Sequence, residues 1–440
     1  MRVMTPHNPL THSHLNKLHT FRQAAYDCFG RSADALFELG DAVLLTPNVH
    51  SFAELSLCPV FRRQWPSLYE ALQDGQVSRR ALLRLYLAEL AHDPRPLLAG
   101  DHTAWSRPEA RTLRDRTVEH QPNRIPDAKP ITVGLGYSTL VYVPQAAGSW
   151  ALPLLHERIA PSDSPRRRMV RQVQQVCEDS PHRPLVMLDA EYGCAPFVAE
   201  AASLDSDWLL RLRPNLRLYT APGRYKGRGR RPKHGRKFKL FDARTWGKPQ
   251  STLALTDPDL GAVQVRCWSG LHFEKAPEQT LWVIRIERVQ TRGSRRQPKV
   301  LWLAWLGQTP PPLAEWWKLY LRRYAVDHWY RFCKQQLHWT LPRLKTPEQA
   351  DVWSDLMPLL TWQLWLARQV AQDKPWPWQK PQTVLTPGRV RQSFATVLTQ
   401  VGTPTRVVKP RGKAVGWVKG RVRRKAERFA VVKKRPKRAP

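Results

Sequence analysis

The sequence predicts an α/β fold in which a mixed sheet, flanked by helices, is interrupted by a β-rich insertion and preceded by an N-terminal helical domain. Three patterns support this prediction. Strand-like and helix-like segments follow one another as β-β-β-α-β-α-β from about residue 95 to residue 212. Residues 215–308 keep a strand-like pattern with short loops, whereas the apolar residues of 1–92 and 313–371 recur at helical spacing.

The N-terminal helical domain is assigned to residues 1–92. Phe21, Ala25 and Phe29 belong to a set of apolar residues spaced by three and four, and residues 82–90 form a second amphipathic run. Side chains at these spacings share one face of a helix and can pack on a common core. We therefore expect a separate helical unit before the first strand of the sheet.

The predicted core consists of two parts, residues 93–214 and 309–372, on either side of an insertion over 215–308. The first part contains predicted strands over 96–105, 131–143, 149–159, 184–188 and 208–212, and predicted helices over 164–178 and 195–204. In the insertion, strands are predicted over 252–255, 262–268, 279–289 and 300–306. The second part is a long helical region, 313–371, that is broken near Pro342.

The last predicted segment, residues 373–440, is a proline-rich linker followed by a basic tail. Pro375, Pro377 and Pro381 begin the linker. The tail, 406–440, contains fifteen Lys and Arg residues with Glu427 as its one acid, and its stretch around 420–432 is compatible with a helix.

The charge balance predicts a polyanionic partner. The chain has 71 Lys and Arg against 36 Asp and Glu, a formal net charge of +35. A second basic segment, 224–239, contains nine Lys and Arg among glycines and is expected to be a loop. Because cations gain affinity for phosphate backbones by releasing counterions, we expect both segments to contact DNA. The candidate DNA-binding residues in them are Arg228, Arg230, Arg231, Lys233, Arg423 and Arg424.

The same composition argues against several other classes of protein. The sequence has no run of about 18 uncharged apolar residues and no apolar stretch near its first residues, so we expect no membrane segment and a cytoplasmic, nucleoid-associated protein. Its six cysteines form no C-x-x-C pair, which predicts reduced thiols and no zinc site or disulfide scaffold.

Three aspartates occupy positions that suit a phosphodiester-cutting site of the ribonuclease H kind. Asp101 lies in the first predicted strand, Asp189 ends the fourth, and Asp327 lies in the helix after the insertion. At 100° per residue, Asp327 falls on one helix face with three further polar side chains, and the opposite face holds the residues expected to reach the core. The polar face comprises Tyr320, Arg323, Asp327 and Lys334; the opposite face comprises Leu321, Ala325, Trp329 and Phe332.

This set of residue types suits hydrolysis of a phosphodiester by metal-activated water. Carboxylates are hard oxygen ligands for Mg²⁺, and a pair of such ions can activate a water and stabilise the leaving oxygen. Arg323 and Lys334 are placed to bind phosphates, and Tyr320 to donate a hydrogen bond to a phosphate oxygen.

The spacing Tyr320-x2-Arg323-x3-Asp327-x6-Lys334 resembles the Y-x2-R-x3-E-x6-K signature of bacterial DDE transposases of the insertion-sequence-four type, with Asp in place of Glu. The segments GDHTAW around Asp101 and LDAEYG around Asp189 also look like that family's motifs, and the likeness spans about 95–345.

The resemblance implies a ribonuclease H-like catalytic domain and a cut-and-paste transposase. Such an enzyme forms a homodimer on the terminal inverted repeats, binds them through the N-terminal helices, and joins the released 3′ ends to target DNA. Asp101, Asp189 and Asp327 are then the catalytic residues and the ligands of Mg²⁺, for which Mn²⁺ substitutes.

Several alternatives remain open at this stage. Asp327 is one methylene shorter than Glu, which also suits an inactive or domesticated transposase that only binds DNA. An RNA-associated basic protein accounts for the charge but not for the aligned polar face. Glu191 is either an auxiliary ligand or a surface carboxylate, and Trp302 and Trp305 are either base-stacking or core residues.

Overall fold

The computed structural model describes residues 9–90, 92–121, 130–144, 148–225, 227, 229–288, 300–408, 416, 418–422 and 425–433. Its α-helices are α1 (Pro9–Asp27), α2 (Ala33–Leu45), α3 (Pro66–Asp74), α4 (Arg79–Ala88), α5 (Pro165–Asp179), α6 (Ala195–Ala201), α7 (Trp316–Leu321), α8 (Tyr324–Gln335), α9 (Pro347–Ala367) and α10 (Pro387–Val401). Its strands are β1 (Leu97–Ser106), β2 (Thr117–His120), β3 (Ile131–Tyr142), β4 (Leu152–Ile159), β5 (Leu185–Leu188), β6 (Asp207–Arg211), β7 (Arg217–Tyr219), β8 (Lys237–Lys239), β9 (Ser251–Asp257), β10 (Gly261–Phe273), β11 (Ala276–Arg288) and β12 (Val300–Leu306).

The core of the sheet has the strand order β4-β3-β1-β5-β6. β1, β5 and β6 run parallel, and β3 is antiparallel to both β1 and β4. The buried strand β5 is uniformly apolar, as expected for a parallel strand covered on both faces. This mixed sheet with flanking helices confirms the predicted ribonuclease H-like fold.

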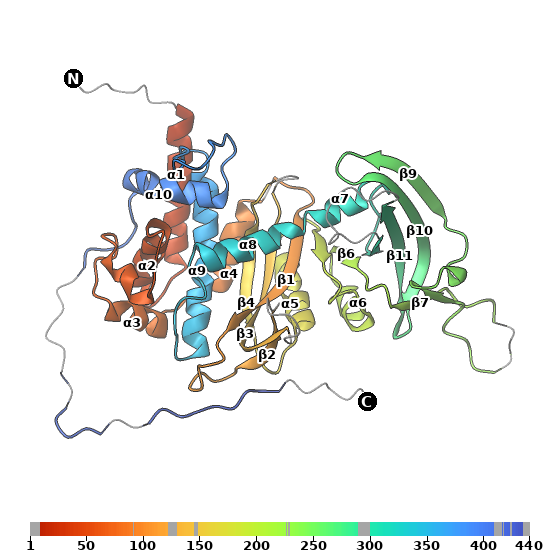
Figure 1. Cartoon of the computed structure of the whole chain (residues 1–440), viewed down its shortest axis with the longest axis horizontal. Coiled ribbons are helices and arrows are strands. Elements are labelled where there is room, and N and C mark those ends of the chain that lie inside the picture. The colour runs from red at the N-terminus through yellow and green to blue at the C-terminus, as the bar shows by residue number, and fades with distance from the viewer. Residues whose placement is uncertain are drawn as a thin grey trace.

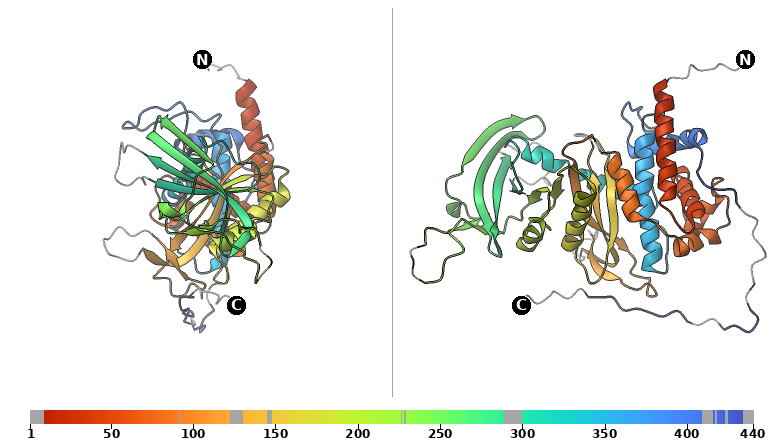
Figure 2. Two further views of the ribbon diagram at one scale, coloured as in Figure 1. Left: turned by 90° about the vertical axis from the view of Figure 1, so that its right-hand side faces the viewer. Right: turned by 180° about the vertical axis from the view of Figure 1, so that it is seen from behind.

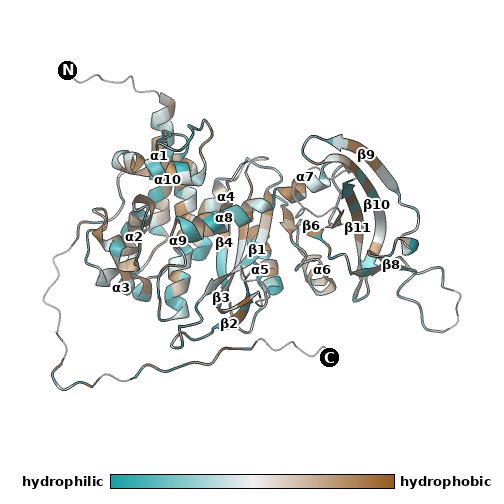
Figure 3. Cartoon of the chain, viewed as in Figure 1, coloured by the Kyte–Doolittle hydropathy of each residue, from teal (hydrophilic) through white to brown (hydrophobic). Residues whose placement is uncertain are grey.

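The insertion continues the same sheet. β12 pairs with β6 on one side and with β11 on the other, and β10 follows β11. Figure 1 shows the long curved strands β9 to β11 at the opposite end of the molecule from α1 and α10. The hydropathy colouring in Figure 3 alternates along these strands, as expected for strands with one face packed and one exposed.

Helices cover both faces of the core sheet. α5 packs on β3, and α9 lies against β4 while also contacting α1, α3 and α10. α9 therefore joins the N-terminal helices to the sheet, and both belong to one hydrophobic core. The view from behind in Figure 2 shows α1 and α9 side by side. Among the described residues, no helix is long and apolar enough to cross a membrane.

The structure corrects several predicted elements. The short strand β2 was not predicted, and the helical region after the insertion divides into α7, α8 and α9. Residues 373–440 were predicted to be a linker and tail, but α10 lies within them and buries Val390 and Phe394. The described tail residues near 420–432 form a turn at 419–420 and no helix.

Aromatic rings under α8 hold the helices to the sheet. The ring of His156, on β4, lies 4.7 Å from Trp339, 5.0 Å from Tyr137 and 5.1 Å from Trp329 between centroids. Its Nδ1 lies 2.8 Å from Thr139 Oγ1. Burial, with smaller effects from Lys334 and Arg79, lowers the pKa of His156 to about 3.

This buried histidine makes stability depend on pH. The folded protein keeps His156 neutral between about pH 6.5 and 3, whereas the unfolded chain takes up a proton in that window, so stability falls as pH falls. From pH 7 to pH 5 this site is expected to cost about 2 kcal/mol of unfolding free energy. Urea unfolding of His156→Asn should show a weaker pH dependence than the parent, and the exposed His120→Asn control should match the parent. Equal slopes for all three proteins would contradict this origin.

Candidate active site

Asp101 is fixed in the middle of the core sheet. It lies on β1 opposite Thr139 of β3. Its neighbour Gly100 leaves room for α5, since a Cβ there would approach Met169 Cε to 2.5 Å. Asp101 Oδ1 accepts the backbone N–H of His102 at 2.7 Å, and Oδ2 accepts Arg323 Nη1 at 3.2 Å. The carboxylate is therefore held in one orientation by both of its oxygens.

Asp189 lies beside Asp101 because of the strand register. The parallel pair β1–β5 aligns Ala99 with Met187, and two further residues along each strand bring Asp101 level with Asp189. Asp189 Oδ1 accepts the backbone N–H of Glu191 at 2.9 Å, which fixes the turn after β5. Gly193 closes this turn against β6, where a Cβ would lie 2.1 Å from the carbonyl of Arg211.

α8 crosses β1, as Figure 1 shows, and through Arg323 its Asp327 is linked to Asp101. Tyr330 donates its hydroxyl hydrogen to the carbonyl of Asp101 at 3.0 Å, and Lys334 Nζ donates to Thr103 Oγ1 at 2.8 Å. Asp327 Oδ2 lies 3.6 Å from Arg323 Nη2, and its side chain is 45% exposed. Arg323, itself almost fully buried, thus contacts both Asp101 and Asp327.

The electrostatics of these groups are coupled. Burial raises the pKa of Asp101, and the charge of Asp189 adds to this rise while Arg323 opposes it. Burial also raises the pKa of Asp327, with Arg323 again opposing and Asp189 adding. The negative charge of Asp189 therefore repels those of Asp101 and Asp327, and Arg323 is the cation in contact with the latter two. Such a site favours an additional cation.

The donor chemistry fits a hard divalent cation such as Mg²⁺. Carboxylate oxygens are its preferred protein ligands, and Asp327 is open to solvent. In the described part of the chain, however, no three acidic, histidine or cysteine side chains converge closely enough to hold a metal as they stand. The guanidinium of Arg323 occupies the space between two of the carboxylates.

The polar face predicted from the sequence is only partly present. The chain turns between α7 and α8, so Tyr320 and Arg323 do not lie on one continuous helix. Tyr320 is buried, and its hydroxyl has no hydrogen-bond partner among the described residues. Leu321, predicted to face the core, is 40% exposed and lines a cavity of about 350 Å³ next to Tyr320. The turn changes which residues face the sheet.

The other predicted residues have separate environments. Arg230, Arg231 and Lys233 are exposed in the connection between β7 and β8, whereas Arg228, Arg423 and Arg424 lie outside the described residues. Trp302 and Trp305 are buried. Their rings therefore belong to the core and are not exposed for stacking on DNA bases.

Glu191 forms ion pairs with neighbouring arginines at the surface. Its carboxylate lies 2.7 Å from Arg166 Nη2 and 2.8 Å from Arg213 Nη2.

Tyr330, which donates a hydrogen bond to the carbonyl of Asp101, was not selected from the sequence. Its position seven residues after Arg323 places it on the same helix face, which is the signal that identifies it.

Comparison with known proteins identifies a family. The sequence model of a family described as "DDE superfamily endonuclease" matches residues 25–272, more than half of the chain. The matched region contains Asp101 and Asp189 and ends before Asp327. No curated protein matches the chain.

Proposed function

The chain belongs to the DDE superfamily endonucleases, and we propose that it is a DNA transposase of the insertion-sequence-four type. In this proposal it cleaves DNA at the ends of a transposon and transfers the released strands into target DNA, acting as a homodimer in the cytoplasm. The terminal inverted repeats are bound by the N-terminal helices. The observation that carries the proposal is the meeting of Asp101, Asp189 and α8 around Arg323.

The three aspartates would hold the metal, which when bound would supply an activated water and stabilise the leaving oxygen. The chain's own groups position the DNA. Lys334 donates to Thr103, two residues after Asp101 on β1, and so presents a positive charge on the same strand as that aspartate. Burial lowers the pKa of Lys334, yet a phosphate beside it favours the charged ammonium. It therefore suits a fixed phosphate-binding role.

Arg323 is proposed to exchange partners when DNA arrives. In the free protein its guanidinium neutralises Asp101 and Asp327. A phosphate offers the same guanidinium a bidentate partner. When the guanidinium moves to the phosphate, both carboxylates become available to a metal ion. DNA binding and metal binding then reinforce each other. The ring of Tyr320 lies beside Arg323, and its buried, unpartnered hydroxyl must be uncovered before it can donate to the same phosphate.

The second candidate is a DNA-binding protein without catalysis. The observation in its favour is the short side chain of Asp327, 3.6 Å from Arg323 and partly exposed. In that case the Asp101–Arg323–Asp327 cluster is a structural ion-pair network.

The test is DNA cleavage by the purified chain. The substrate is duplex DNA containing the sequences that flank the gene, incubated with Mg²⁺, Mn²⁺ or EDTA. The transposase proposal expects metal-dependent breaks with 3′-hydroxyl ends at the element's borders. Tight binding of these borders without breaks in either metal would favour the second candidate.

A further inference from the structure

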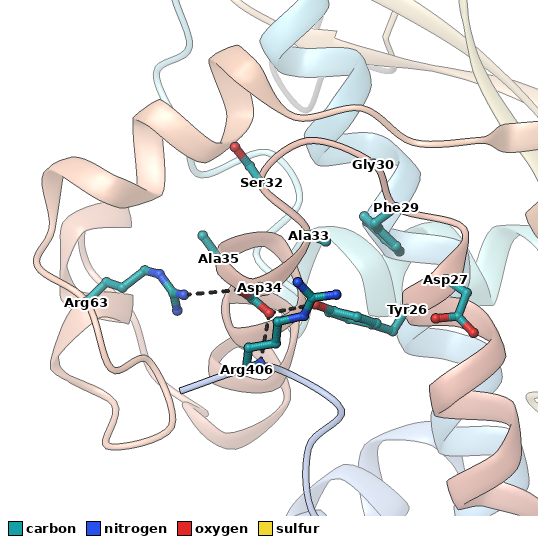
Figure 4. Close-up of a pocket in the computed structure, with 10 residues that line it drawn as sticks. All are labelled: Tyr26, Asp27, Phe29, Gly30, Ser32, Ala33, Asp34, Ala35, Arg63 and Arg406. Carbon is teal, nitrogen blue, oxygen red and sulfur yellow. Dashed lines mark hydrogen bonds and ion pairs between the residues drawn. The ribbon is translucent and has the colours of Figure 1, made fainter. Parts of the chain in front are cut away.

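The basic tail returns to the body of the protein at two places. The first is in the N-terminal helical unit, where the backbone N–H of Arg406 donates to Asp34 Oδ1 at 2.9 Å and Arg62 Nη2 donates to the carbonyl of Arg406 at 2.8 Å. Asp34 and Arg406 line a pocket in this unit, which Figure 4 shows. Tyr26 and Arg63 also point at Asp34 there. The beginning of the tail is thus anchored.

The second anchor is at the edge of the core sheet. The backbone N–H of Phe429 donates to the carbonyl of Arg111 at 2.8 Å, and that of Val432 donates to the carbonyl of Arg116 at 2.7 Å. The buried Arg116 returns a hydrogen bond from Nη2 to the carbonyl of Phe429 at 3.1 Å. Val432 also forms a parallel bridge with Thr117 of β2. Figure 1 shows the tail passing below β2 on its way to the C-terminus.

The docked segment has the alternation of a strand. Phe429 and Val431 are half-buried, whereas Arg428, Ala430 and Val432 are exposed. Apolar side chains therefore face the protein while a cation faces outward, and the next residue, Lys433, is also exposed. The tail meets the outer edge of β2 through one bridge, and its backbone hydrogen bonds go to the loop just before β2.

Other exposed cations adjoin this edge. The loop before β2 touches the segment after α8, because Arg107 Nη1 donates to the carbonyl of Pro342 at 3.3 Å and Arg114 pairs with Glu348. Burial lowers the pKa of Arg107, and the nearby charge of Arg343 adds to this effect. Arg343 therefore lies close to the loop on which the tail docks.

We call the following six residues the basic track: Arg331, Arg343, Lys345, Arg111, Arg428 and Lys433. All six are exposed, and none pairs with a carboxylate in the described ranges, unlike Arg158 or Arg80. Arg331 begins the track one helical turn after Asp327, close enough that its charge affects the pKa of that carboxyl, although burial has the larger effect.

We propose that the basic track binds the backbone of duplex DNA leading away from the three aspartates, and that the tail completes the track by docking on β2. This inference rests on the proposed action on DNA. Unpaired, exposed arginines and lysines retain their full capacity to replace counterions on phosphates. Docking fixes Arg428 and Lys433 in place, so less conformational entropy is lost when DNA binds them.

The experiment tests whether DNA binding depends on where the tail is docked or only on the charge that it carries. In Phe429→Ser/Val432→Pro the tail keeps every charge but loses its half-buried ring and one backbone donor. Its release is measured as faster trypsin cleavage after Arg428, and unchanged thermal unfolding shows that the body remains folded. Binding is measured by fluorescence anisotropy with a short labelled DNA duplex of arbitrary sequence in EDTA, so cleavage is not needed.

The released tail is expected to weaken binding about 10-fold and to reduce the slope of log Kd against log salt by about 2, one for each cation that leaves the track. Arg343→Glu/Lys345→Glu should weaken binding at least as much. Lys374→Glu/Lys380→Glu, the matched charge change beside α10, should stay within about twofold of the parent. Parent-like binding by the released-tail protein, or an equal loss in the Lys374/Lys380 control, would overturn the basic track. Absence of cleavage by the parent would contradict only the proposed transposase activity.

Discussion

Asp189→Asn is expected to reduce DNA cleavage by about 10³-fold or more while leaving DNA binding within about twofold. The change removes one negative ligand from the proposed metal site, and metal-assisted charge stabilisation is worth several kcal/mol of the barrier. Asn retains an oxygen that can accept the backbone N–H of Glu191, so the turn after β5 should persist. The measurement is the rate of metal-dependent cleavage at saturating protein.

The neighbouring Glu191→Gln is the matched control for this prediction. It also removes one carboxylate from the turn after β5, but this carboxylate pairs with Arg166 and Arg213 at the surface. Its cleavage rate is expected to stay within about threefold of the parent, because exposed ion pairs contribute little. Equal losses in the two variants would mean that general charge, not a metal ligand at Asp189, controls the rate.

Replacement of Asp327 should show whether the natural chain is an active enzyme or has lost its catalytic activity. Asp327→Ala is expected to lose cleavage to the same extent as Asp189→Asn. Asp327→Glu should retain activity within about 10-fold, since the partly exposed site has room for a side chain about 1.5 Å longer. Both variants are compared with the parent by cleavage rate and by the metal concentration that gives half the maximal rate.

Two patterns of results would contradict the assignment of Asp327. If Asp327→Ala cleaves as fast as the parent, α8 does not supply a ligand. If the parent is inactive and Asp327→Glu cleaves, the natural chain is a DNA-binding protein that has lost its catalytic side chain, which is the second candidate function.

The sequence predicts the core sheet well because its signals are local. β5 is a short apolar run between turn residues, and β12 was predicted with its observed bounds, 300–306. The proximity of Asp101 and Asp189 follows from these local signals, since adjacent parallel strands place equivalent residues level with each other.

Features that depend on distant contacts could not be predicted in this way. The turn between α7 and α8 interrupts a pattern whose helical periodicity continues through it, and it leaves Leu321 exposed and Tyr320 buried.

The C-terminal elements were also missed. α10 begins with Pro387, which suits the first turn of a helix but resembles the linker prolines before it. The extended tail is set by its hydrogen bonds to residues 111 and 116, more than 300 positions away in the sequence. Arg323 lies between the carboxylates because three elements converge there, which helical spacing alone does not indicate.

The most direct test of the central claim, that the three aspartates share one metal site, is iron-directed cleavage of the protein chain. Fe²⁺ replaces Mg²⁺ in the presence of ascorbate and peroxide, and the hydroxyl radicals cut the backbone near the bound ion. We expect cuts near residues 101, 189 and 327 together, suppressed by excess Mg²⁺ and by Asp189→Asn. Cuts near 101 and 189 without any near 327, or cuts that persist in Asp189→Asn, would contradict the shared site.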